Sequence, residues 1–267
     1  MPLRLSPTFR DDLTGATRPL VGMWVCSGSP LIAEICAGAG LDWLLIDMEH
    51  SPNGLESVLG QLQAVAAHQV TPVVRVPTNE TVTIKQVLDL GAQNLLVPMV
   101  SSADEARAAV EAVRYPPRGK RGVGSALARS ARWNRVEGYL EHADEQVSLF
   151  VQVETAAGVE AAAEIAAVDG VDGVFVGPSD LAASMGLIGQ QSHPDVVAAV
   201  RRTFDAVRAA GRPVGVNAFA PDAARAYLEA GATFVLVGAD VALLARSSEA
   251  LAATFIPADA EGGETTS

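Results

Sequence analysis

The chain has 267 residues, of which 49% are hydrophobic and only 5% aromatic, and its formal net charge is −12. This length can bury one large core or two small ones, whereas the acidic charge argues against nucleic acids and anionic membranes as partners. The N-terminal residues lack the apolar stretch of a signal peptide, and no apolar run approaches the ~20 residues that cross a bilayer. We therefore expect a cytoplasmic protein.

Strand-like apolar runs alternate with helical patterns along the chain. The predicted strands cover residues 20–25, 43–47, 72–76, 94–99, 148–154, 173–177, 213–217 and 234–238. The helical patterns between them include residues 55–68, 79–90, 103–113, 158–167, 196–210 and 221–229. Eight strand–helix units in a chain of this length predict an α/β fold, a single (β/α)8 TIM barrel. We expect the barrel to occupy residues 1–256, followed by a disordered acidic tail at 257–267.

A weak internal repeat supports the count of eight units. The segments AGAGLDWLLID, DLGAQNLLVPM, AVDGVDGVFVG and EAGATFVLVG each combine a helix end, a glycine, a short turn and an apolar strand. The competing fold is a doubly wound open sheet, which commonly carries a glycine-rich dinucleotide fingerprint after its first strand. The sequence there reads WVCSGSP, which favours the barrel.

Polar residues stand at the ends of several apolar predicted strands, where barrel enzymes carry their reactive groups. Glu154 closes the fifth strand and Asp180 follows the sixth, so we expect both carboxylates at the barrel mouth. Gln152 shares the inward face with Glu154 because side chains alternate along a strand. Two carboxylates, completed by water and a chelating substrate, suit Mg²⁺, Mn²⁺ or Co²⁺. The alternative is an ion pair between either carboxylate and an arginine near the mouth.

The second and third predicted strands end in groups suited to proton transfer and to anion binding. His50 lies three residues after Asp47, close enough for the carboxylate to orient the imidazole as a general base. Arg75 interrupts the apolar run PVVRVP, and an arginine is rarely buried without a partner. It is expected either to stabilise an enolate oxygen or to form a salt bridge with Asp47, Glu49 or Glu154.

The lysine count and a long insertion narrow the chemistry further. Lys85 and Lys120 are the only lysines, and neither stands at a strand end, which argues against a lysine-imine mechanism. Residues 115–147 form an insertion after the fourth strand. Its basic residues are expected to anchor the loop or to contact another subunit; they include Arg118, Lys120, Arg121, Arg129, Arg132 and Arg135.

The chain resembles the HpcH/HpaI family of metal-dependent (class II) pyruvate aldolases from about Gly22 to Ala245. The segments that carry the resemblance are AGAGLDWLLIDMEHSPN, PVVRVP, LDLGAQNLLVPMV, YPPRGKRGVG, VQVET and GVFVGPSDLAASMG. It implies a barrel of the phosphoenolpyruvate/pyruvate-binding type that reversibly cleaves 4-hydroxy-2-oxo acids to pyruvate and an aldehyde, through a metal-stabilised enolate. It also implies a homo-oligomer, usually a hexamer, whose last helix is exchanged between subunits.

The same resemblance implies roles for individual residues. Glu154 and Asp180 would bind the divalent metal, Arg75 would stabilise the enolate, and His50, supported by Asp47, would transfer protons through water. The residues implied to contact the substrate are Arg75, Gln152, Gly177, Pro178, Ser179 and Asp180. Asp89 matches a family position that reaches toward the neighbouring subunit's site.

Two departures from the family pattern leave the acceptor aldehyde open. Ser179 stands where the family often has alanine, and WVCSGSP differs from the commoner loop after the first strand. Oxaloacetate decarboxylation or a CoA-ester lyase reaction could use the same enolate, but the sequence has no nucleotide-recognition motif for the latter. A catalytically silent barrel that senses metabolites is a further alternative. It predicts a broken site, whereas every family position that can be placed is filled.

Overall fold

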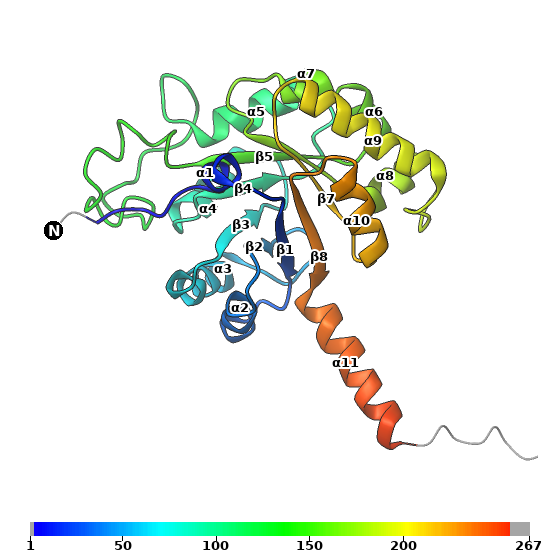
Figure 1. The fold of residues 1–267 in the computed structure, drawn as a ribbon. Coiled ribbons are helices and arrows are strands. Elements are labelled where there is room, and N and C mark those ends of the chain that lie inside the picture. Colours follow the sequence, from blue (N-terminus) through cyan, green and yellow to red (C-terminus); the bar gives the residue numbers. More distant parts are fainter. Residues whose placement is uncertain (1–2, 257–267) are drawn as a thin grey trace, which may run out of the picture.

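The computed structural model describes residues 3–256 as an eight-stranded parallel barrel surrounded by helices (Figure 1). Each strand pairs with the next along the chain, and β8 closes the barrel against β1, which confirms the predicted fold. The strands are β1 (Leu20–Val25), β2 (Trp43–Asp47), β3 (Thr71–Arg75), β4 (Asn94–Val97), β5 (Ser148–Val153), β6 (Gly173–Val176), β7 (Val214–Asn217) and β8 (Phe234–Ala239).

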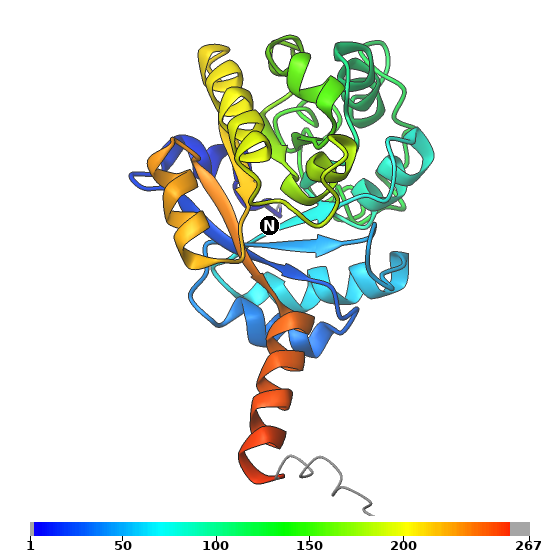
Figure 2. The ribbon, with the colours of Figure 1, turned by 90° about the vertical axis from the view of Figure 1, so that its right-hand side faces the viewer.

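Helices follow most strands and cover the outside of the barrel (Figure 2). They are α1 (Phe9–Gly15), α2 (Pro30–Ala37), α3 (Leu55–Ala64), the 3₁₀ turn η1 (Val65–Ala67), α4 (Thr81–Asp89), α5 (Ala103–Val113), α6 (Ala156–Glu160), α7 (Ala162–Ala166), α8 (Pro178–Ser184), α9 (Pro194–Ala209), α10 (Pro221–Glu229) and α11 (Asp240–Phe255). Four of them, α1, α2, α8 and α11, lie outside the helical patterns named above. The helical pattern at 158–167 forms two short helices that meet at Ala161.

Aromatic side chains fill the end of the barrel where the strands begin. Phe9 of α1 lies with its ring centroid 5.0 Å from Trp43, 5.2 Å from Phe150 and 5.5 Å from Phe234. Gly215 makes room for this packing, since a Cβ atom there would lie 2.3 Å from the Phe234 ring. The N-terminal helix therefore plugs one end of the barrel, and the polar strand ends gather at the other.

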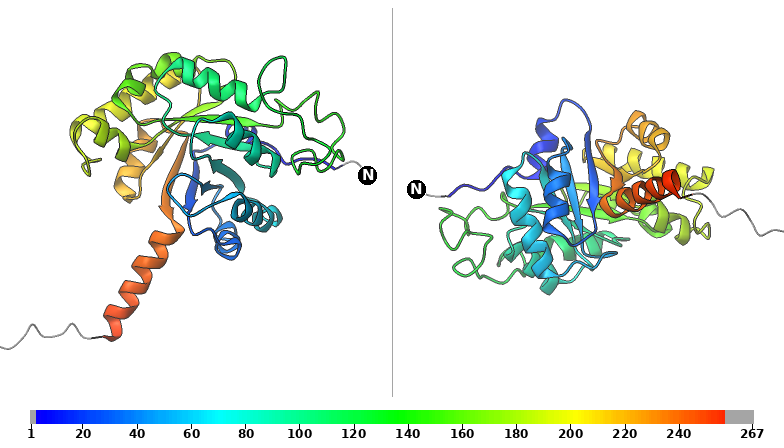
Figure 3. Two further views of the ribbon diagram at one scale, coloured as in Figure 1. Left: turned by 180° about the vertical axis from the view of Figure 1, so that it is seen from behind. Right: turned by 90° about the horizontal axis from the view of Figure 1, so that it is seen from below.

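Helix α11 leaves the barrel and extends away from it (Figure 1 and the left view of Figure 3). Asp240, its first residue, is buried and accepts hydrogen bonds from the backbone nitrogens of Cys26 (2.8 Å) and Ser27 (3.0 Å). Along residues 3–256, no helix combines the length and apolar character needed to cross a membrane. The predicted tail at 257–267 lies outside the described residues.

The insertion between α5 and β5 is tied to the barrel by its basic residues. Arg121 is fully buried, with its guanidinium 4.5 Å from the centroid of the Tyr115 ring. Lys120 pairs with Glu111 at 2.5 Å, and Arg118 pairs with Asp144 at 2.8 Å. Arg129 and Arg132 donate to the carbonyl oxygens of Leu90 and Arg129. These contacts agree with the expected role of the basic residues as loop anchors.

Candidate active site

The carboxyl ends of neighbouring strands bring most of the predicted site residues to one end of the barrel. Asp47 and Arg75 are register partners at the ends of β2 and β3. Gln152 lies in β5, and Glu154 follows that strand directly. All four side chains are buried. Buried polar groups are costly without partners, so their contacts indicate what the site is built to hold.

Arg75 is held on three sides and keeps one nitrogen free. Its Nε donates to Asp47 Oδ1 at 2.8 Å, and its Nη1 lies 2.7 Å from Glu49 Oε2. The guanidinium carbon stacks 4.3 Å from the centroid of the Trp24 ring. The predicted salt bridges to Asp47 and Glu49 are thus present. Within residues 3–256 the Nη2 group has no hydrogen-bond partner, so it is available to a bound oxyanion.

The carboxylate of Asp47 holds the loop that follows β2. This carboxylate accepts hydrogen bonds from the backbone nitrogens of Glu49 (3.0 Å) and His50 (3.2 Å), besides that from Arg75. The His50 ring is 65% exposed, and its Nε2 lies 3.9 Å from Glu49 Oε2. Asp47 therefore holds the backbone of the loop that carries His50. Orientation of the His50 imidazole by Asp47 stays a prediction.

Glu49 is a site residue to which the sequence analysis gave no role beyond a possible partner of Arg75. Burial raises the pKa of its carboxyl, with a smaller contribution from Asp47 and Asp180, while Arg75 and His50 act in the opposite direction. The pKa of Glu49 therefore depends on the charge of Arg75 and on the charges of the acidic residues of the site. The sequence signal was its place in the run Asp47–His50 after β2, where three ionisable side chains lie within four residues.

Glu154 is as deeply buried as Asp47, each with 1% exposure. Its Oε1 accepts a hydrogen bond from the Met99 backbone nitrogen at 2.7 Å, and its Oε2 accepts one from Gln152 Nε2. Burial raises the pKa of Glu154 to about 7, and the charges of Glu49 and Asp180 add to the rise. This concentration of negative charge, with no basic partner for Glu154 within residues 3–256, favours binding of a cation.

Asp180 stands in the first turn of α8, on the strand-end side of the barrel, and its side chain is exposed. Gly177 precedes this helix, and a Cβ atom at that position would lie 2.7 Å from Glu154 Oε2 and 2.9 Å from Gln152 Nε2. Only glycine leaves this space open. The start of α8 therefore lies close to Glu154, and the charge of Asp180 acts on the Glu154 carboxyl.

The residues at the mouth fit a divalent cation. Glu154 and Asp180 offer carboxylate oxygens, the donor type that Mg²⁺ and Mn²⁺ prefer. Within residues 3–256, no group of three or more histidine, cysteine, aspartate or glutamate residues is arranged to hold a metal ion. If Glu154 and Asp180 bind a cation, its remaining coordination positions are left to water and substrate.

Asp89 is the predicted site residue that the fold does not bring to the mouth of its own chain. It ends α4, and its Oδ1 lies 3.8 Å from Arg121 Nη2. Burial raises the pKa of Asp89, whereas Arg121 and Lys85 lower it. Because α4 runs from the mouth toward the opposite end of the barrel, only a second chain could bring another active site to Asp89. Its proposed contribution to a neighbouring site stays a prediction.

Comparisons with known proteins agree with this geometry. The sequence profile described as HpcH/HpaI aldolase/citrate lyase matches residues 20–247. The chain is 53% identical over 257 residues to the hydroxypyruvate/pyruvate aldolase of Deinococcus radiodurans, covering 95% of this chain and 92% of that protein. It is 53% identical over 247 residues to the 4-hydroxy-2-oxo-heptane-1,7-dioate aldolase of Salmonella dublin, covering 92% and 94%. A solved HpcH/HpaI aldolase/citrate lyase family protein from Burkholderia cenocepacia has a TM-score of 0.87 at 44% identity, covering 91% and 96%.

Proposed function

Because the chain belongs to the HpcH/HpaI aldolase/citrate lyase family and is a carbon–carbon lyase, we propose that it reversibly cleaves 4-hydroxy-2-oxo acids to pyruvate and an aldehyde. One observation carries the proposal. A buried arginine with a free Nη2 group, Arg75, stands at the same end of the barrel as the carboxylate pair of Glu154 and Asp180. That combination suits a substrate that develops negative charge on a keto oxygen.

The carboxylates of Glu154 and Asp180 would hold a divalent metal, either Mg²⁺, Mn²⁺ or Co²⁺, which when bound polarises the keto group of pyruvate and stabilises enolate charge. Arg75 would add a second positive group at the keto oxygen, and its attachment to Asp47 and Glu49 fixes the direction of the free nitrogen. Gln152 would line the pocket, where its Oε1 is buried without a hydrogen-bond partner in residues 3–256.

The start of α8 would bind the substrate carboxylate. The backbone nitrogens of Ser179 and Asp180 lie in the first helical turn, where no intrahelical acceptor exists. Gly177 already donates its backbone N–H to Val153, and Pro178 has no N–H to donate. Of the predicted segment Gly177–Asp180, only Ser179 and Asp180 would therefore donate backbone hydrogen bonds to the substrate carboxylate. Pro178 would form part of the wall of the substrate pocket.

His50 would move the proton between the substrate and water. Its exposure places the ring within reach of solvent, and its Nε2 lies 3.9 Å from the Glu49 carboxylate. A histidine can exchange a proton near neutral pH because its ordinary pKa is close to 6.5. Asp47 would support this role by fixing the backbone of the loop that carries His50.

Exchange of the pyruvate methyl protons with solvent tests this function without knowledge of the acceptor aldehyde. In D2O, we expect the enzyme with Mn²⁺ or Mg²⁺ to remove the methyl signal of pyruvate in proton NMR spectra, because enolisation labels that carbon. Excess chelator should stop the exchange, and renewed metal should restore it. Exchange that persists in chelator would exclude the metal role, and its absence under both conditions would exclude the proposed reaction.

We further propose that the protein forms a homo-oligomer through α11. Three apolar residues of that helix, Leu244, Leu251 and Phe255, are 63–76% exposed and share one helical face. Two apolar residues of α2, Leu31 and Ile35, are 64% and 62% exposed. Such a concentration of exposed apolar side chains marks an interaction surface. The hexamer with an exchanged last helix, which the resemblance implies, and the cytoplasmic location remain predictions.

Placing a charge on this face should reduce the size of the assembly. We expect Leu244→Glu to elute as a smaller species than the unmodified protein in size-exclusion chromatography with light scattering, since the carboxylate would be buried in the interface. Ala253→Glu is the matched control, because it adds the same charge on the opposite side of α11, at ~100° per residue. An unchanged mass for Leu244→Glu would show that α11 does not hold the subunits together.

A further inference from the structure

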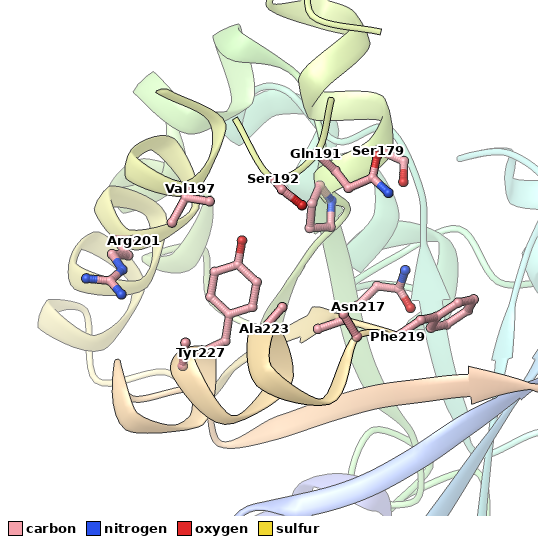
Figure 4. Close-up of a pocket in the computed structure, with 13 residues that line it drawn as sticks. Ser179, Gln191, Ser192, Val197, Arg201, Asn217, Phe219, Ala223 and Tyr227 are labelled. Carbon is pink, nitrogen blue, oxygen red and sulfur yellow. The ribbon is translucent and has the colours of Figure 1, made fainter. Parts of the chain in front are cut away.

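A cavity of about 410 Å³ lies between α8, α9 and α10, beside the end of β7 (Figure 4). Its volume lies within the range of small-molecule sites in proteins, roughly 300–1,000 Å³. Small side chains from the first turns of α10, including Ala220 and Ala223, form one wall. Pro178 and Ser179, from the proposed substrate-binding start of α8, are part of its lining, whereas Arg75, Gln152, Glu154 and Asp180 are not. The cavity therefore borders the proposed pyruvate site and extends away from it.

The cavity is lined by neutral hydrogen-bonding groups. Tyr227 is only 6% exposed, and its hydroxyl points into the cavity toward Ser192 (Figure 4). No protein group within residues 3–256 hydrogen-bonds this hydroxyl, which opens onto the cavity. Burial raises the pKa of Tyr227, so the hydroxyl remains a donor. Gln191 and Asn217 add amide groups, whereas the lining contains no acidic residue. Because the Tyr227 hydroxyl faces the open cavity, it is free to bond a ligand group there.

The cavity adjoins the proposed reaction centre on two sides. Ser179, which lines the cavity, directly precedes Asp180 and lies two residues after Gly177, a chain distance of at most ~7 Å. Asn217, which also lines the cavity, accepts a hydrogen bond from Trp24 Nε1 at 2.8 Å. The Arg75 guanidinium stacks on the ring of Trp24. A chain that extends from the reacting carbon can therefore reach the cavity past Ser179 and Asn217.

We propose that this cavity binds the hydroxylated chain of the acceptor aldehyde and that Tyr227 determines the preference for such chains. The inference rests on the proposed aldolase function. A polyhydroxylated chain satisfies the hydroxyls of Tyr227 and Ser192 and the amide of Asn217, whereas an alkyl chain of equal length leaves them unpaired. Sites built to bond a hydroxyl discriminate strongly against the analogue that lacks it.

The one charged residue of the lining is Arg201, which is exposed and lies at the outer edge (Figure 4). A terminal carboxylate on the acceptor is the competing ligand chemistry for this position. Exposed charges contribute little because water screens them, whereas Tyr227 and Ser192 occupy the interior. The geometry therefore favours neutral hydroxyl groups as the principal ligand, and an acceptor with a carboxylate serves as the comparison.

Acceptors of four carbons separate these possibilities. The rate of aldol addition to pyruvate would be measured with D-erythrose, butanal and succinic semialdehyde for the metal-loaded enzyme. We expect kcat/KM to be highest for D-erythrose. Tyr227→Phe should lower that value about three- to tenfold, the effect of one neutral hydrogen bond, and leave the value for butanal unchanged. Ala223→Leu, which fills the cavity, should impair D-erythrose more than the two-carbon glycolaldehyde.

Pyruvate methyl exchange without an acceptor distinguishes the two proposals. Both variants should exchange pyruvate protons at the unmodified rate, because neither residue touches the metal or Arg75. If the unmodified enzyme does not exchange at all, the aldolase proposal fails. If exchange is normal but Tyr227→Phe changes kcat/KM for D-erythrose and for butanal equally, or changes neither value, the cavity does not select hydroxyl groups. A preference for succinic semialdehyde that Arg201→Gln abolishes would likewise overturn the inference in favour of an anionic chain.

Discussion

Replacing Glu154 by glutamine should lower metal-dependent pyruvate exchange by at least ~10²-fold. The substitution keeps the size of the side chain and can still accept the Met99 hydrogen bond, but it removes one of the two carboxylates proposed to bind the metal. Asp180→Asn should have the same effect for the same reason. Exchange rates would be measured by NMR over a series of Mn²⁺ concentrations. Glu160→Gln, on the exposed surface of α6, provides the matched control.

If Glu154→Gln exchanges pyruvate at the normal rate, the metal assignment is wrong. A loss of activity that higher Mn²⁺ concentrations partly restore would instead locate the defect in metal affinity. The control variant should be indistinguishable from the unmodified enzyme at every metal concentration, since its carboxylate lies in solvent. These comparisons separate loss of a ligand from a general effect of removing one negative charge.

The pH dependence of stability shows whether Glu154→Gln is folded. Burial raises the pKa of Glu154 from 4.5 to about 7, so the native metal-free protein holds this proton more tightly than the unfolded chain. The stability that the protonated Glu154 contributes is fully present below its pKa in the unfolded chain, 4.5. This stability is lost as the pH rises through about 7. With chelator present, the Tm of the variant relative to the unmodified protein should rise between pH 5 and pH 8, by on the order of 5 °C.

A Tm difference that is the same at both pH values would contradict the raised pKa of Glu154. A variant that unfolds at much lower temperature at pH 5 and pH 8 alike would attribute its inactivity to loss of structure. The predicted sign is informative because a mutation of a purely structural residue would lower Tm. A buried carboxylate that destabilises the metal-free protein is what a binding site requires, since the bound cation compensates for the cost.

The fold could be predicted from the sequence because the barrel repeats one local pattern eight times. The ends of elements were harder to predict where the chain makes specific tertiary contacts. The predicted strand at 94–99 ends at Val97, since Met99 adopts a φ of 56° and donates its N–H to Glu154. Helix α1 was missed although Thr8 and Asp11 form a capping box. Its seven residues bury only Phe9 and give no apolar period.

The sequence allowed single site residues to be predicted at the end of each strand, but not the contacts between residues of different strands. Arg75 and Glu154 stood out because polar residues that close apolar strands are costly to bury alone. The tertiary contacts that position Arg75 could not be predicted from the sequence. Trp24 stacks on Arg75 and donates to Asn217, and these residues belong to three strands separated by 51 and 142 positions (75 − 24 and 217 − 75).

Arg75→Lys should lower kcat for aldol cleavage by ~10²-fold or more, the scale of losing one oxyanion donor. Lysine keeps the positive charge beside Asp47 and Glu49, so the buried carboxylates are not left without a counter-charge. It lacks the planar fork with which arginine bonds Asp47, Glu49 and a third oxygen together. It also lacks the flat face that stacks on Trp24. Arg107→Lys, in an exposed pair on α5, is the control.

The division of that loss between kcat and KM distinguishes catalysis from binding. A group that stabilises developing enolate charge acts mainly in the transition state, so kcat should fall while KM for the substrate changes little. If KM rises and kcat is unchanged, Arg75 binds the substrate without stabilising the enolate. If neither kcat nor KM changes in Arg75→Lys, the ion pairs of Arg75 with Asp47 and Glu49 are structural. Pyruvate exchange should fall with kcat, because both reactions pass through the same charged oxygen beside the free Nη2 group of Arg75.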